Sequence, residues 1–157
     1  MAGLRLKAED LDDLQVISAC VQDAVVKVGD MAYVPRTRQF AVMLNRYRWE
    51  NAAQPGDVRF ADVVKGRAPN PRERVRAGLA FGSVLRARRQ GIAQQAAEQV
   101  LSLLAIEAQA GADAAATITL IFAGGAQVRL DVECVDVRLE DLGQPWPVRR
   151  RPAHALE

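Results

Sequence analysis

The chain has 157 residues, a net charge of +2, 50% hydrophobic residues and 25% charged residues. This composition is typical of one globular domain, which buries roughly two-thirds of its unfolded surface, and it excludes a disordered chain. The sequence shows neither an apolar run of about 20 residues nor a signal peptide, and its two cysteines are isolated. We therefore expect a cytoplasmic protein with no membrane partner, cofactor or zinc site.

The first predicted elements are a short strand and the main helix. Residues 4–7 alternate between apolar and basic side chains, which is the period of a half-buried strand. Asp10 is suited to cap a helix, and apolar residues then recur at helical spacing. This pattern predicts a helix from Leu11 to Asp23.

Short alternating runs follow the helix and indicate strands joined by turns. We expect a hairpin across Gly82–Ser83, a second hairpin at Gly124–Gly125, and a β-bulge or bend near Cys134–Val135, where the alternation changes phase. Residues 100–106 are apolar on both faces, which suits either a central strand covered on both sides or a buried helix. The remaining predicted strands cover residues 25–28, 31–34, 40–49, 75–81, 84–89, 117–122 and 128–139.

These elements predict a mainly β (α+β) fold. We expect an antiparallel small barrel or sandwich of eight or nine strands with one N-terminal helix, a pleckstrin-homology-like barrel being one such form. The globular domain is expected to cover residues 1–143, with an extended C-terminal tail at 144–157. Residues 50–72 hold several prolines and glycines and are expected to form a long loop.

The residues that usually carry catalysis are sparse. The only histidine, His154, lies near the C-terminal end, where no second group is placed to orient it. Asp131 and Glu133 share one face of a predicted strand and could hold a divalent cation, but alternating arginines make a solvated face the competing interpretation. We predict no catalytic residue and no metal ligand.

Basic residues gather in one part of the sequence. Residues 57–89 contain nine Lys and Arg against three Asp and Glu, whereas residues 90–157 contain five against nine. If the two strands flanking Gly82–Ser83 pair, their arginines could share one phosphate-binding surface. A solvated face partly paired with acidic residues is the competing interpretation, and the 5% aromatic content favours it. The arginines concerned are Arg74, Arg76, Arg86, Arg88 and Arg89.

An aromatic and basic strand end offers a second binding candidate. Arg46, Tyr47 and Trp49 follow one another closely at the end of a predicted strand. Their rings could stack on bases and the guanidinium could bind phosphate.

Five stretches together resemble the alphaproteobacterial domain-of-unknown-function family 2948. The resemblance runs from about Leu4 to Trp146, with residues 51–71 and the tail outside it, and it implies a compact bacterial domain with no assigned activity. It supplies no catalytic residues. The stretches are residues 22–30, residues 44–46 running on to 49–50, and residues 101–107, 122–125 and 138–143.

We accordingly expect a non-catalytic binding or interaction module whose partner is a protein or a second copy of the chain. A nucleic-acid-binding domain that uses the arginine-rich strand face is the alternative. A carboxylate- or metal-dependent enzyme is a further alternative, which the missing catalytic constellation disfavours.

Overall fold

The computed structural model describes residues 3–49, 73–93 and 95–147, which form nine strands, one α-helix and one 3₁₀ turn. Every strand pair in this part of the chain is antiparallel. The predicted β-rich class with one helix near the N-terminus is therefore confirmed. The elements are β1 (Arg5–Ala8), α1 (Leu11–Cys20), β2 (Ala24–Val34), β3 (Gln39–Tyr47), β4 (Glu73–Phe81), β5 (Val84–Gln90), β6 (Val100–Ala110), β7 (Ala116–Phe122), η2 (Ala123–Gly125), β8 (Gln127–Val132) and β9 (Val137–Pro147).

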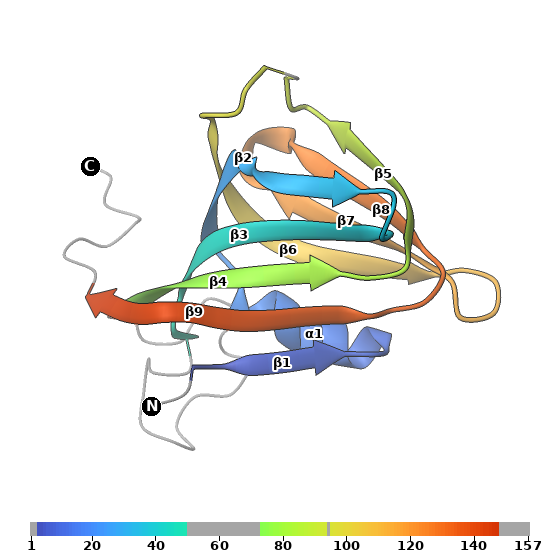
Figure 1. Ribbon diagram of the computed structural model, residues 1–157, viewed down its shortest axis with the longest axis horizontal. Helices are drawn as coiled ribbons and strands as arrows, with labels where there is room; N and C mark the ends of the chain where they lie inside the picture. The colour runs from blue at the N-terminus through green and yellow to red at the C-terminus, as the bar shows by residue number, and fades with distance from the viewer. Residues whose placement is uncertain (1–2, 50–72, 94, 148–157) are drawn as a thin grey trace.

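All nine strands belong to one sheet, in the order β1-β9-β4-β3-β2-β6-β7-β8-β5. Figure 1 shows the sheet curling around the core. The edge strands β1 and β5 do not pair with each other within the described residues, so the sheet is not closed. Of the two predicted forms, the structure lacks the separate sheets of a sandwich and instead has a single curled sheet.

The core lies on the inner face of the curled sheet. On β7 every second residue is buried, as the alternating sequence predicts. The rings of Phe40 and Phe81 meet across β3 and β4 with centroids 6.1 Å apart. Helix α1 packs against β1 and β6 at the lower end of the sheet (Figure 1), where the Ile106 amide donates to Ser18 Oγ over 2.9 Å. Burying a large apolar side chain contributes about 1.5–3 kcal/mol, so this interior supplies most of the stability.

Helix α1 begins as predicted and ends earlier than predicted. The Asp10 carboxylate accepts a hydrogen bond from the Asp13 amide over 2.7 Å, which confirms the predicted N-cap. The helix stops at Cys20, and Asp23 has a left-handed φ of 63° in the turn before β2. Helical backbone cannot continue through a residue in that conformation. Asp23 is also half-buried, and burial raises the pKa of its carboxyl group.

Strand β2 corrects one prediction and opens a gap in the sheet. The predicted strands 25–28 and 31–34 form one strand, and its pairing with β3 shifts register between Val26 and Met31. Its pairing with β6 ends at Lys27. The second half of β2 therefore pairs only with β3 and faces β5 across a gap.

The predicted hairpin between β4 and β5 is wrong. Strand β4 pairs with β3 and β9, whereas β5 pairs with β8 at the edge of the sheet. Ser83, with a left-handed φ of 56°, turns the chain between them. Alternation identifies a strand but carries no information about its partner, so the sequence pattern could not distinguish these pairings.

The double-sided burial predicted for residues 100–106 is also wrong. This segment is the start of strand β6, but Val100 and Leu104 are 59% and 44% exposed. Nothing among the described residues covers their face, because the core and α1 lie on the other one. The hairpin at Gly124–Gly125 is confirmed, since β7 and β8 pair on either side of it.

The bend predicted near Cys134 is confirmed and separates two strands with different partners. Strand β8 pairs with β5 and β7, whereas β9 pairs with β1 and β4. Strand β9 continues to Pro147, so residues 144–147 belong to the sheet and not to the predicted tail. The rest of that tail and the predicted loop at 50–72 lie outside the described residues.

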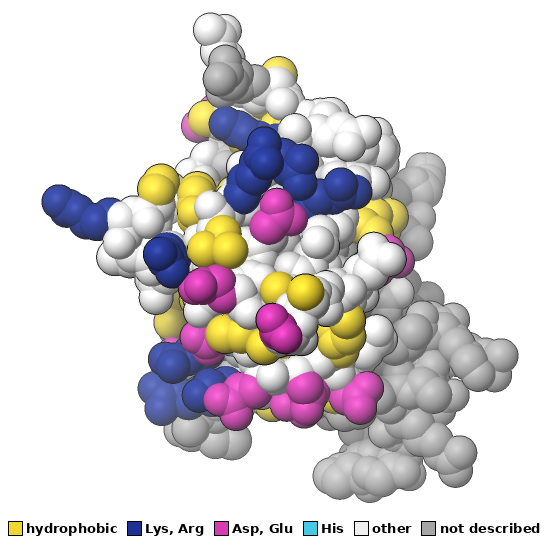
Figure 2. Space-filling view, turned by 90° about the vertical axis from the view of Figure 1, so that its right-hand side faces the viewer, with side chains coloured by type: hydrophobic (Ala, Val, Ile, Leu, Met, Phe, Trp, Pro, Cys, Tyr) yellow, Lys and Arg dark blue, Asp and Glu magenta, His cyan; other side chains and the backbone are white. Residues whose placement is uncertain are grey.

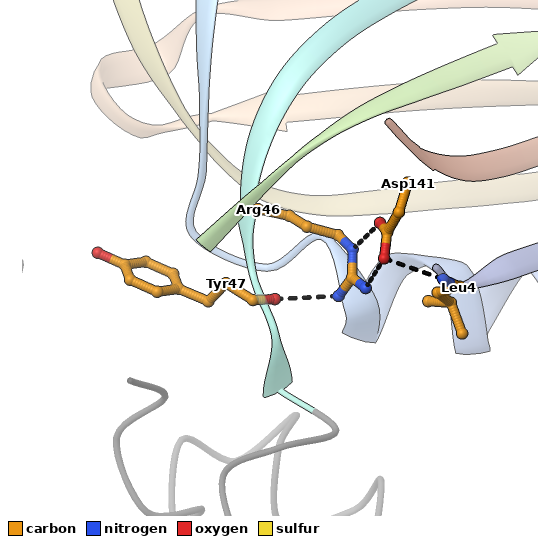
Figure 3. Close-up of polar contacts among 4 residues, drawn as sticks. All are labelled: Leu4, Arg46, Tyr47 and Asp141. Atoms are coloured by element: carbon orange, nitrogen blue, oxygen red, sulfur yellow. Dashed lines mark hydrogen bonds and ion pairs between the residues drawn. The ribbon is translucent and has the colours of Figure 1, made fainter. Parts of the chain in front are cut away.

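A buried ion pair ties three of these strands together (Figure 3). Arg46 of β3 donates from Nε and Nη2 to the two carboxylate oxygens of Asp141 on β9, each over 2.8 Å, across the intervening strand β4. The Leu4 amide, just before β1, donates to Asp141 Oδ2 over 3.0 Å. The Arg46 and Asp141 side chains are 0% and 3% exposed, so this bidentate contact is shielded from water.

We predict that Arg46→Met lowers the free energy of unfolding by about 3–5 kcal/mol, because it leaves a buried carboxylate without its cation. Urea denaturation measures the loss. The control is Arg5→Ala, which removes an exposed ion pair between β1 and Glu140 of β9 and is expected to cost about 0–1 kcal/mol. Equal losses in the two variants would contradict the assigned role of the buried pair.

We further predict that Asp23→Asn stabilises the protein at neutral pH. Because burial raises the pKa of Asp23, its charged form is disfavoured in the fold, and this cost is present above the raised pKa. The cost disappears below pH 3.8, the ordinary pKa of an aspartate, because the carboxyl group is then protonated in the folded and unfolded chains alike. Urea denaturation at both pH values checks the change.

The matched control for this substitution is Asp113→Asn. Asp113 has a similar left-handed φ of 55° but is exposed. A stabilisation of Asp23→Asn that persists unchanged in acid would show that backbone preference, and not charge burial, is its cause.

Candidate functional site

The five arginines of the predicted basic surface divide into two groups, because β4 and β5 do not pair. Arg74 and Arg76 lie on β4, between β9 and β3 in the sheet order. Arg86, Arg88 and Arg89 lie on the edge strand β5. The structure therefore does not place all five on one surface.

The two arginines of β4 are engaged in contacts with neighbouring strands. Arg74 lies with its guanidinium carbon 4.3 Å from the centroid of the Tyr47 ring, and its Nη2 donates to the Tyr47 hydroxyl over 2.5 Å. Arg76 forms a 3.3 Å ion pair with Asp30 of β2. Both side chains are partly buried and serve to join strands.

The aromatic strand end is turned inward as well. Arg46 is held by Asp141, and Tyr47 is only 2% exposed. Trp49 donates from its indole nitrogen to the Gln22 carbonyl over 3.0 Å, and its ring lies edge-on to Tyr47, with centroids 5.8 Å apart. The Tyr47 and Trp49 rings are held by these contacts and do not lie beside the arginines of β5. The two rings therefore do not form a stacking platform next to those arginines.

The three arginines of β5 are exposed and are joined by Arg129 of β8. Arg88 and Arg129 lie directly opposite each other in the ladder, and Arg86 lies opposite Asp131. Figure 2 shows Lys and Arg side chains gathered near the top of this side of the molecule, with an acidic side chain against them. Arg86, Arg88 and Arg129 share one face of the ladder, whereas Arg89 lies opposite the buried Val128 on the other face and reaches the same edge beside the cleft. We call Arg86, Arg88, Arg89 and Arg129 the arginine surface. Arg129 was not predicted to be part of it, because the pairing of β5 with β8 joins segments about 40 residues apart in sequence.

The arginine surface is only partly neutralised. Arg88 Nη2 lies 3.3 Å from Asp131 Oδ2, and both side chains are more than a third exposed, so the ion pair is weak. Like charges directly opposite each other in a sheet destabilise it. A bound anion would reduce the repulsion between Arg88 and Arg129, because a guanidinium group can bind a carboxylate through two hydrogen bonds.

A cleft of about 210 Å³ opens beside the arginine surface, between β5 and the second half of β2. Its floor is apolar and consists of the buried residues Val28, Phe40 and Val128. Arg88 and Arg89 line its β5 side and also line a neighbouring shallow hollow that includes Arg129. An apolar recess and a cationic surface therefore share two residues.

The carboxylates considered for a cation site are occupied by arginines. Asp131 pairs with Arg88, and Glu133 pairs with Arg38 over 2.8 Å. Among residues 3–49, 73–93 and 95–147, His, Cys, Asp and Glu do not gather into a group that could hold a metal ion. His154 lies outside these ranges.

Two further observations concern the cysteines and the helix. Cys20 is buried and Cys134 is half-buried, with the Cys134 Sγ 3.6 Å from Ser83 Oγ, and the two cysteines do not form a disulfide. In the part of the chain that the structure describes, no helix has the length and apolar character needed to cross a membrane.

Comparison with known proteins places the chain in a family. Residues 4–154 match the family described as "Protein of unknown function (DUF2948)", which confirms the predicted resemblance and extends it through residues 51–71 and beyond Trp146. Neither the curated proteins nor the solved structures contain a match to the chain. Because the family match covers nearly the whole chain, this protein belongs to the DUF2948 family.

Proposed function

We propose that this protein is a non-catalytic binding module that recognises an acidic segment of a partner protein through the arginine surface. The observation that carries the proposal is the pairing of Arg88 opposite Arg129, with Arg86 and Arg89 near them on β5 and an ion pair between Arg88 and Asp131. Carboxylates of a partner would satisfy guanidinium groups that the fold leaves in mutual repulsion.

The exposure of these arginines determines how strong the binding is and how it depends on salt. Each solvent-exposed ion pair contributes about 0–1 kcal/mol and is screened by salt. Several such pairs would steer and orient an acidic partner more than they would bind it tightly. We therefore expect a reversible association that weakens as salt is added.

An acidic protein segment fits the surface better than a nucleic acid. Nucleic-acid binders combine positive charge with rings on which bases stack. The hollow that joins Arg88, Arg89 and Arg129 is otherwise lined by Gln90 and Gln127. The aromatic residues of the adjacent cleft are Phe40, which is buried, and Tyr33, which is half-buried with its hydroxyl bonded to the Val84 carbonyl. The arginines themselves would suit phosphate, so single-stranded RNA is the competing ligand in the test below.

A second copy of the chain is another source of an acidic segment. Glu9, Asp10, Asp12 and Asp13 are exposed at the start of α1. Pairing of this segment with the arginine surface of another copy would produce a head-to-tail contact. Sedimentation at increasing protein concentration measures such self-association.

We also propose that the module acts in the cytoplasm. The two cysteines do not form a disulfide, which suits a reducing compartment.

The test measures binding of a short labelled glutamate-rich peptide at low and moderate salt. We expect salt-sensitive binding that falls at least tenfold in the triple variant Arg86→Ala, Arg88→Ala and Arg89→Ala, because three charge-assisted contacts are removed. Fluorescence anisotropy gives the dissociation constants. The control triple variant, Arg5→Ala, Arg36→Ala and Arg138→Ala, loses the same net charge from other exposed positions.

Equal losses in the two triple variants would show that net charge, and not the arginine surface, determines binding. Binding of a labelled single-stranded RNA in preference to the peptide, with loss only in the first triple variant, would replace the proposal with nucleic-acid recognition.

A further inference from the structure

The cleft beside the arginine surface adds a second kind of contact to the same site. Its opening is a consequence of the fold, because the backbone hydrogen bonds of β2 to β6 and to the segment before it end at Gly29, and the second half of β2 lines the cleft together with the edge strand β5. The cleft is closed at one end, where the Tyr33 hydroxyl donates to the Val84 carbonyl over 2.8 Å. It is therefore a defined recess and not a continuation of the flat sheet face.

The recess presents apolar atoms from both sides. Val28, Phe40 and Val128 are at most 5% exposed and form its floor. Met31, Tyr33 and Ala87 are partly buried and pack against the core around it. An apolar group placed there would be removed from water where it meets these side chains, which contributes favourable binding free energy.

The volume limits what the recess can hold. Pockets for complete small-molecule ligands usually measure about 300–1,000 Å³, and this one measures about 210 Å³. It is therefore suited to one side chain of a longer ligand. The remainder of that ligand would lie across Arg88 and Arg89, which line both the recess and the neighbouring hollow.

We infer that the cleft receives a single apolar side chain of the acidic partner segment, whose flanking carboxylates bind the arginine surface. This inference rests on the proposed function and adds specificity to it. The recognised segment would carry one large apolar residue between acidic residues. Charge complementarity at Arg88 and Arg89 argues for this occupant, because an apolar segment with no charge would leave the cationic rim unsatisfied.

The experiment compares two labelled peptides that differ at one position. Both are glutamate-rich, and one has a central leucine where the other has glycine. Burying the leucine side chain should make the first peptide bind at least tenfold more tightly. The variant Ala87→Leu fills the recess and should abolish this preference, while the glycine peptide should bind as it does to the unaltered protein.

The control is Ala80→Leu, which adds the same side chain at a half-buried alanine on β4 that does not line the cleft. It should keep the leucine preference. Binding of the glycine peptide to Ala87→Leu also shows that this variant is folded.

The outcomes separate the two proposals. Equal binding of the leucine and glycine peptides to the unaltered protein would overturn the inference and leave the proposed function standing. A leucine preference that survives in Ala87→Leu would place the apolar contact elsewhere and would also overturn it. Binding of neither peptide would overturn both proposals.

Discussion

The bidentate ion pair between Arg46 and Asp141 is the contact on which the arrangement of the sheet depends. It joins β3 to β9 beneath β4, and Asp141 also accepts from the backbone just before β1. Strands β3 and β9 and the chain just before β1 are thereby linked through one carboxylate. A buried ion pair adds little net stability compared with apolar packing. Its geometry, however, is satisfied in only one register of these strands, so the pair favours a unique arrangement over alternatives that slip by one residue.

The buried ion pair fixes the register of the half of the sheet that contains β1, β9, β4 and β3. The other half, which ends at the edge strand β5, has an open edge. Strands β6, β7, β8 and β5 follow β2 along the sheet, and the curl brings β5 back toward the second half of β2 without a ladder between them. Charged residues on an exposed edge strand also prevent unwanted pairing with other chains. The arginines of β5 therefore suit two roles, since the same charges that discourage edge-to-edge aggregation would attract the acidic partner that we propose.

The sequence was informative about elements and much less so about their neighbours. Alternation located most strands, and the polar residues before Leu11 located the helix start, because both signals are local. The pairing of β5 with β8 could not be predicted from the sequence pattern, because strand pairing depends on long-range packing. Arg46 illustrates the same limit, because an arginine at a strand end is normally solvated, and the carboxylate that balances its buried charge, Asp141, lies 95 residues later.

The candidate site could be predicted in part for the same reason. Arg86, Arg88 and Arg89 were found because they are close together in sequence. Arg74 and Arg76 were grouped with them through a hairpin that does not form, and Arg129 was missed because its strand partner was unknown. The apolar recess had no sequence signal, since its walls come from four strands. Local composition therefore indicated the charge of the site but not its shape.

The start of β5 has a consequence for the direction in which a ligand can lie. The Val84 amide donates to the Arg38 carbonyl over 2.8 Å, and the Val84 carbonyl accepts from Tyr33, so both backbone groups of this residue are fastened to the β2–β3 end. From there β5 rises away from β2, as Figure 1 shows. A strand fastened at its first residue and diverging toward its last leaves a wedge with one narrow and one wide end. A segment bound in such a wedge has different surroundings at its two ends. The fold therefore favours one direction of the bound segment, because the reverse direction would place its side chains in the wrong order.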